Sequence, residues 1–120
     1  MKITINDHRK IRAIQEEFNS AFPFLKLEFL SKPSSHNGAP AIKLMHSGKS
    51  IGECRTIHTS GEITITPALT VVDLEQRFSD VYGLSVLVLR KSGKVWLETT
   101  VTDGWTLEEQ NAQGEALNCN

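Results

Sequence analysis

Cysteine is scarce in this sequence, and neither a long apolar run nor an export segment is evident, so three classes of protein are not expected. The 120 residues include two cysteines, Cys54 in mid-chain and Cys119 in a polar tail, so we expect reduced thiols and no disulfide framework. The longest uninterrupted apolar run, Val86 to Leu89, is too short to span a membrane. No apolar run follows the first charge, at Lys2, so neither a secretory signal nor a membrane anchor is predicted. We therefore expect a cytoplasmic protein.

An excess of charge of either sign is also lacking. The chain carries 13 Lys and Arg against 14 Asp and Glu, a balance that provides no field to gather nucleic acid or anionic lipid. Its hydrophobic fraction of 39% and charged fraction of 22% are typical of a globular protein. A chain of this length fits one domain, so residues 1–120 are predicted to form a single domain.

Residues 1 to 30 predict a strand, a helix and a second strand. Ile3 and Ile5 alternate with polar residues in the first strand, and Asn6 and Asp7 can cap the helix that follows. The helix is amphipathic, because apolar residues recur every three or four positions, and Pro23 ends it. The second strand alternates apolar and charged residues. The apolar positions of the helix and second strand are Ile11, Ile14, Phe18, Phe22, Leu25, Leu27 and Phe29.

Residues 61 to 90 repeat this order. Thr70 is predicted to cap the second helix and Gly83 to end it. A strand from Ser85 to Arg90 follows, apolar on both faces. Similar physical demands on two strand-helix-strand units could produce this similarity without a duplication of one ancestral unit. The similarity therefore does not decide whether the two halves arose by duplication. Adding 60 superposes Ile3-Thr4-Ile5 on Ile63-Thr64-Ile65, Ile11 on Val71, Ile14 on Leu74, Phe18 on Phe78, Phe22 on Tyr82 and Leu27 on Leu87, with Val81 completing the second helical stripe.

Two strand-helix-strand units in tandem predict an α+β, ferredoxin-like two-layer sandwich. The expected sheet is antiparallel or mixed, has the strand order 4-1-3-2, and carries both main helices on one face. A turn at Ser92-Gly93 should lead into a fifth strand over 95–101, hairpinned onto the fourth. A capping box at Thr106 should open a short helix that Gly114 closes. Residues 94–114 thus form a C-terminal extension of the repeat.

Residues 31–60 are an insertion between the two units. A loop is predicted over 32–40, which is rich in Ser, Pro, Asn and Gly. Beyond it, 42–45 and 51–57 could pair as a hairpin across 46–50. Alternatively, 51–57 could turn at 59–61 and pair with 62–66, which is the preferred interpretation.

No motif in the insertion is complete enough to predict a reaction, a cofactor or a metal. Gly48-Lys49-Ser50 matches the end of a phosphate-binding loop, but Lys43 stands where the motif requires glycine. Cys54 and His58, with His36 and His46 upstream, offer metal ligands without the paired spacing that structural zinc requires. A strand over 51–57 would hold Cys54 and His58 too far apart to share an ion or a proton. We therefore expect no catalytic, cofactor-binding or metal residues, and lean against an enzyme.

Nucleic-acid binding through the sheet or the basic patches is a further hypothesis, which the sequence does not favour. RNA-recognition domains of this architecture stack bases on aromatic residues of the two central strands. Those strands here would carry Ile3-Thr4-Ile5 and 62–65, which contain no aromatic residue. Basic residues cluster at 8–12 and 90–94, but acidic residues are mixed through the rest of the chain.

The fourth and fifth strands contain the most informative pattern. Leu87 and Leu89 would lie on the face opposite Val86 and Val88, so both faces of this strand are apolar. The insertion, the Thr106 helix with Trp105, or a second protein chain could cover the second face. A candidate interaction surface for a protein partner or a second copy therefore comprises Leu87, Leu89, Trp96 and Trp105.

A polar cluster in the extension supports a different hypothesis, a small-molecule-binding domain or small enzyme. Turn and capping chemistry around Asp103-Gly104 and Thr106 explains the same residues more simply. The candidate polar site comprises Thr99, Thr100, Thr102, Asp103, Gln110 and Asn111.

Residues 90–100, with the sequence RKSGKVWLETT, are followed by Thr102-Asp103, Trp105-Thr106-Leu107, Glu109-Gln110-Asn111 and Gly114. This segment resembles the C-terminal signature of a family of small uncharacterised bacterial proteins, with the pattern RKSGxVWLxTTxTDxWTLxEQNxxG. The resemblance implies that the extension is a characteristic part of the protein. The family carries no known activity, so the resemblance implies no catalytic residue.

Overall fold

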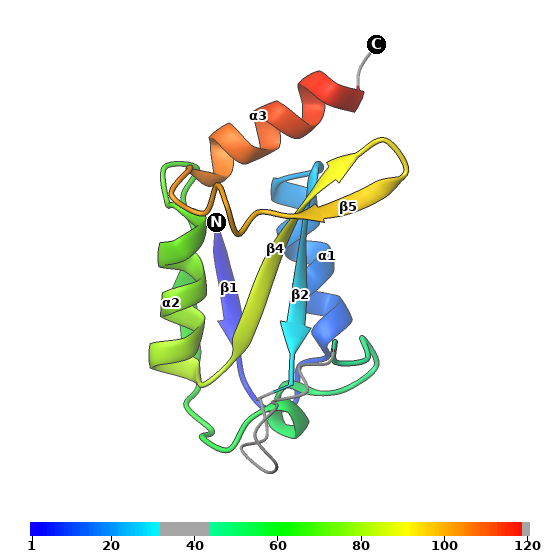
Figure 1. Ribbon diagram of the computed structural model, residues 1–120. Coiled ribbons are helices and arrows are strands. Elements are labelled where there is room, and N and C mark those ends of the chain that lie inside the picture. Colours follow the sequence, from blue (N-terminus) through cyan, green and yellow to red (C-terminus); the bar gives the residue numbers. More distant parts are fainter. Residues whose placement is uncertain (32–43, 119–120) are drawn as a thin grey trace, which may run out of the picture.

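The computed structural model describes residues 1–31 and 44–118 as an α+β protein with three α-helices and two antiparallel sheets (Figure 1). The predictions for 32–40, for residues 42 and 43, and for His36 and Cys119 fall outside the described residues. In chain order the elements are β1 (Lys2–Ile5), α1 (Ile11–Ala21), β2 (Leu25–Leu30), the 3₁₀ helix η1 (Ile51–Cys54), β3 (Gly61–Thr64), α2 (Val71–Tyr82), β4 (Ser85–Ser92), β5 (Val95–Glu98) and α3 (Leu107–Asn118).

The strands form a pair, β1-β3, and a three-stranded sheet in the order β2-β4-β5. The pairing of β1 with β3 agrees with the predicted order 4-1-3-2, but β2 pairs with β4 and not with β3. The predicted order is therefore wrong at β2, and β1 and β4, which were predicted to be neighbours in one sheet, belong to separate sheets. A short hairpin would have held β3 against β2, whereas the long insertion leaves β2 free to pair with the strongly apolar β4.

Both ladders relate the two halves of the chain by an approximate two-fold axis. Ile3 lies directly opposite Ile63, the residue 60 positions later. Leu27 lies opposite Val88 on the buried face, whereas Leu87 lies opposite Glu28 on the outer face, so the predicted superposition of Leu27 on Leu87 is wrong by one residue. Each strand therefore pairs with the corresponding strand of the other half, in the predicted register for β1 and β3 and shifted by one residue for β2 and β4.

The core fills the space between the inner faces of both ladders and the apolar stripes of α1 and α2. Phe29 and Phe78 meet edge to face, with ring centroids 6.0 Å apart. The predicted stripe of α2 needs one correction, because Val81 is exposed and Tyr82 is buried in its place. Fully buried core side chains include Ile3, Ile5, Ile11, Ile14, Phe18, Leu25, Leu27, Phe29, Ile51, Ile65, Leu74 and Phe78.

The ends of α2 agree with the prediction from the sequence, whereas the start of α1 does not. Thr70 accepts a hydrogen bond from the backbone N–H of Asp73, and Gly83 ends α2 with φ of 63°. Before α1, the Asn6 side chain accepts from two backbone N–H groups of the preceding turn. Lys10 then precedes α1 without a side-chain cap, and Asp7 takes no part in capping.

Residues 44–60 adopt neither of the predicted strand pairings. Residues 51–54 form η1, capped where Ser50 and Glu53 bond to each other's backbone N–H groups. Leu44 makes a single bridge to Leu30. The predicted 51–57 strand is therefore wrong, because this capping box closes a turn at its start.

Side chains cover the outer edges of the strands in both repeat units. Tyr82 and Arg77 donate to carbonyls of β3, Arg9 donates to β1, and Thr99 donates to β4. On β2, the amides of Gln15 and Asn19 donate to the carbonyls of Leu27 and Leu25. These bonds satisfy backbone carbonyls that could otherwise pair with a strand of another molecule.

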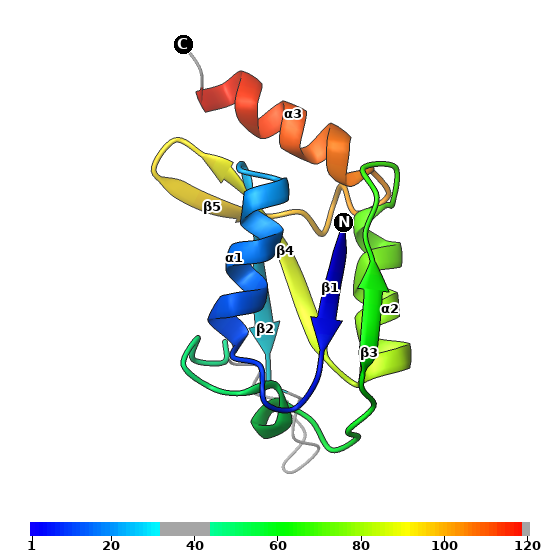
Figure 2. The same ribbon diagram turned by 180° about the vertical axis from the view of Figure 1, so that it is seen from behind.

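The C-terminal extension begins with β5, which pairs with β4 and projects from the body of the protein (Figures 1 and 2). β5 ends at Glu98 and not at Val101, which lies 97% exposed in the following turn. The Thr106 capping box is confirmed, since Thr106 and Glu109 bond reciprocally. α3 runs past Gly114 to Asn118, so the predicted closure at Gly114 is wrong.

Gly114 is explained by close packing. A β-carbon there would lie 2.8 Å from Cβ of Phe24 and 3.3 Å from Cγ of Arg90. Glycine thus allows α3 to approach β2 and β4 directly.

We expect Gly114→Ala to lower the free energy of unfolding by about 1 kcal/mol. Overpacking costs about 1–3 kcal/mol and outweighs the ~1 kcal/mol that alanine contributes within a helix. Urea unfolding should show this loss, while Gln113→Ala at the exposed neighbouring position should cause none. Equal stability of both variants would contradict this packing role.

Candidate interaction surface

Leu87, Leu89 and Trp96 lie together on the outer face of the β2-β4-β5 sheet. Val86 and Val88 point into the core, so alternation directs Leu87 and Leu89 outward. Trp96 lies opposite Lys91, the next outward residue of β4. All three predicted residues are half-buried, although β4 is the central strand of its sheet.

Charged side chains surround these apolar groups. Leu89 lies between Lys26 on β2 and Glu98 on β5, and Glu28 lies opposite Leu87. Nζ of Lys26 is 2.8 Å from Oε1 of Glu28 and 5.9 Å from the ring centroid of Trp96. The face therefore combines an apolar centre with a polar border, as protein interfaces do.

Trp105 does not belong to this face. Its ring lies 5.7 Å from Cζ of Arg90, which alternates with Leu89 and so points to the opposite side of β4. α3 covers that side. The structure thus brings together three of the four predicted surface residues and separates the fourth.

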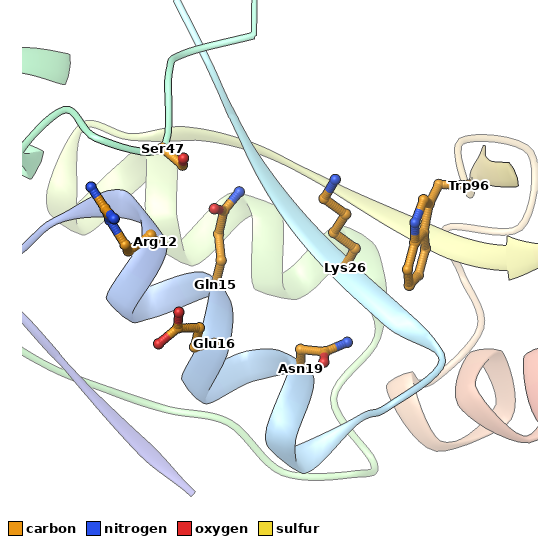
Figure 3. Close-up of a pocket in the computed structure, with 7 residues that line it drawn as sticks. All are labelled: Arg12, Gln15, Glu16, Asn19, Lys26, Ser47 and Trp96. Carbon is orange, nitrogen blue, oxygen red and sulfur yellow. The ribbon is translucent and has the colours of Figure 1, made fainter. Parts of the chain in front are cut away.

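A groove with a cavity volume of about 460 Å³ extends from Trp96 along α1 (Figure 3). The predictions did not include it, because its walls come from distant parts of the chain. The only local signal was the polar face of α1, on which four lining residues recur at helical spacing. The groove is lined by Arg12, Gln15, Glu16 and Asn19 from α1, Lys26 from β2, Ser47 and Trp96.

Several polar groups of the groove already have partners within the protein. The amide nitrogens of Gln15 and Asn19 lie 2.8 and 2.9 Å from the β2 carbonyls that they cover. Lys26 is paired with Glu28. The groove is therefore an open depression between polar side chains and the Trp96 ring, and it continues the outer face of the sheet.

The predicted polar cluster anchors α3 and the N-terminus of α2. Gln110 is buried, donates to Thr102 and accepts from Arg90, while Asn111 accepts from the backbone N–H of Phe24. The Thr99 hydroxyl donates to the carbonyl of Val88 over 2.8 Å. Backbone carbonyls of Asp103 and Trp105 accept the first N–H groups of α2, and Thr100 lies exposed after β5. Most residues of the candidate polar site therefore already hold hydrogen bonds that stabilise the fold.

A buried arginine forms a second polar centre that the sequence did not indicate. The Arg55 side chain is 0% exposed, and its Nε and Nη2 donate to Oδ1 of Asp7 over 3.1 and 2.9 Å. Its Nη1 donates to the carbonyl of Tyr82. Nδ1 of His58 lies 2.7 Å from the other oxygen of Asp7. The network joins the end of β1 to the end of α2.

This network lowers the pKa of Asp7. The largest cause is the hydrogen bond with His58, and the bonds from Arg55 add to it against a rise from burial.

Cys54 is not placed for nucleophilic catalysis. Its thiol donates to the carbonyl of Ser50, and burial raises its pKa, which disfavours the reactive thiolate. His58 is already engaged with Asp7. Over residues 1–31 and 44–118, no group of three or more His, Cys, Asp or Glu side chains could hold a metal ion. Within the same residues, no helix is long and apolar enough to cross a membrane.

No protein-family model matches this chain, and neither the curated proteins nor the solved structures include a significant match to it.

We expect Asp7→Asn to lower the melting temperature at pH 7, because Arg55 would lose the carboxylate that neutralises it. The lowered pKa means that the carboxylate stabilises the fold above the unfolded-state pKa of about 3.9 and loses this effect as pH falls through the folded-state pKa. Thermal unfolding should therefore show a gap between variant and parent at pH 7 that narrows toward pH 3.

Asp80→Asn on the exposed surface of α2 serves as the control. An Asp7→Asn variant as stable as the parent at pH 7 would contradict a stabilising role for the network.

Proposed function

We propose that this protein is a non-enzymatic binding module of the cytoplasm, which contacts a protein partner through the outer face of β2-β4-β5. The observation that carries the proposal is the partial exposure of Leu87 and Leu89 on a central strand. In an antiparallel sheet the solvent-facing side of a strand is ordinarily polar, whereas this side of β4 carries two leucines. Exposed apolar surface bordered by charge is typical of an interaction site.

Trp96 strengthens the proposal. Tryptophan is enriched among the residues that dominate binding energy, because its large ring loses much apolar surface to water when a partner covers it. Here the ring lines the groove and lies beside the Lys26 ammonium. A partner seated on the sheet face could therefore place a side chain in the groove.

The polar cluster favours this proposal over a small-molecule site. Thr99, Gln110 and Asn111 each hold a hydrogen bond within the protein, which a ligand would have to displace. The resemblance of residues 90–114 to small bacterial proteins supplies no activity that would argue otherwise.

Site-specific photo-crosslinking in the source cells tests the proposal. A photoreactive residue in place of Leu89 should capture a discrete protein, whereas the same residue in place of Thr4, exposed on β1, should not. Trp96→Ala should weaken the captured complex by about tenfold or more, and Trp105→Phe on the opposite side should leave it unchanged. Absence of an adduct at position 89, or identical adducts at both positions, would contradict the proposal.

A further inference from the structure

Among residues 1–31 and 44–118, no hydrogen-bond partner is found for the backbone groups on the outer edge of β5. Ser92 and Val95 face each other across the two-residue loop of Gly93 and Lys94, so this pair exchanges hydrogen bonds. Alternation then directs the N–H and C=O of Leu97 toward β4 and those of Trp96 and Glu98 away from it.

Bonds to β4 support this assignment. The Thr99 hydroxyl donates to the carbonyl of Val88 from the side of β4 that faces away from β2. The backbone groups of Val88 therefore point away from β2. Arg90, two residues later, turns to the same edge, where it lies opposite Leu97. Lys91 instead donates to Phe24 on the β2 side. The alternation along β4 therefore agrees with that of β5.

β5 differs in this respect from the strands of the repeat. Side chains bond to the outer edges of β1, β2, β3 and β4. In the part of the chain that the structure describes, no such bond reaches the outer edge of β5. Val95 is 57% and Leu97 43% exposed on one face of the strand, and the hairpin projects from the body (Figures 1 and 2).

The sequence of this edge is complementary to itself. Lys94 and Glu98 carry opposite charges and lie two residues before and after Trp96. If two β5 strands align antiparallel about Trp96, Lys94 faces Glu98 of the partner subunit at both ends. Val95 then faces Leu97 of the partner subunit, which joins the exposed apolar side chains in cross-strand pairs.

This alignment also matches the direction of the backbone groups. It makes Trp96 and the partner's Trp96 a hydrogen-bonded pair, and Trp96 is a residue whose N–H and C=O point outward. A charge at the end of an edge strand ordinarily discourages pairing with other strands. Opposite charges at symmetric positions discourage other partners and favour a second copy.

We infer that two copies of this protein associate through antiparallel pairing of their β5 strands, centred on Trp96, and join their three-stranded sheets into one. The inference rests on the proposed function in so far as Trp96 belongs to both surfaces, and it names a second copy as one partner. Pairing would place the two outer faces side by side, with both Trp96 rings near the axis.

A charge-swap experiment tests the pairing and its register. Light scattering during size-exclusion chromatography, from about 1 µM to about 1 mM, should show a dimer of the parent protein. Lys94→Glu and Glu98→Lys should each weaken dimerisation about tenfold, because both end pairs become repulsive. The double variant should restore it, and an equimolar mixture of the two single variants should form a heterodimer. Lys2→Glu, on exposed β1, should have no effect.

A parent protein that is monomeric throughout, or a dimer indifferent to the charges at 94 and 98, would overturn the inference. A dimer lost on Leu89→Gln but unaffected by the charge changes would also overturn it, and would indicate face-to-face association that leaves the proposed function intact. Conversely, restoration by the double variant without any adduct at position 89 would support β5 pairing and count against the proposed function.

Discussion

The pairing of β2 with β4 is the interaction on which the rest of the structure depends. Each of these strands has an apolar inner face that its own strand-helix-strand unit cannot bury, because a single unit offers one helix and one short additional strand. Paired, they bring Leu27 and Phe29 beside Val86 and Val88 in a shared core. The same pairing forces an approximate two-fold relation between the halves, since each strand meets its own counterpart.

Two ladders in place of one continuous sheet create additional strand edges, and helical side chains cover them at equivalent positions. Gln15 of α1 donates to the carbonyl of Leu27, while Glu75 of α2, 60 residues later, accepts from the N–H of Val88. Burial raises the pKa of Glu75, with that backbone bond opposing the rise. Polar side chains of both helices thus form hydrogen bonds with strand backbones as well as with solvent.

Part of the candidate interaction surface lies where the repeat is interrupted. β5 has no equivalent in the first unit, and it contributes Trp96 to the sheet face, to the groove and to the open edge. α3 packs against the opposite side of β4 through Gly114 and does not cover Leu87 and Leu89, which are half-buried. The repeat therefore provides the core and the two leucines of the candidate surface, and the extension adds Trp96.

The sequence by itself determined the elements whose causes are local. Periodicity placed α1, α2 and the strands of both units, and the caps at Thr70, Gly83 and Thr106 were evident from turn and capping chemistry. Alternation along β4 also identified Leu87 and Leu89 as a second apolar face.

Only the tertiary structure decided which strands pair and that residues 51–54 form the 3₁₀ helix η1. It also decided how the Asp7–Arg55–His58 network and the groove assemble. These depend on contacts between residues far apart in the chain, for which spacing along the sequence carries no signal. Trp105 illustrates the limit. It shares its residue type and sequence neighbourhood with Trp96, yet the turn before α3 carries it to the other side of β4, beside Arg90.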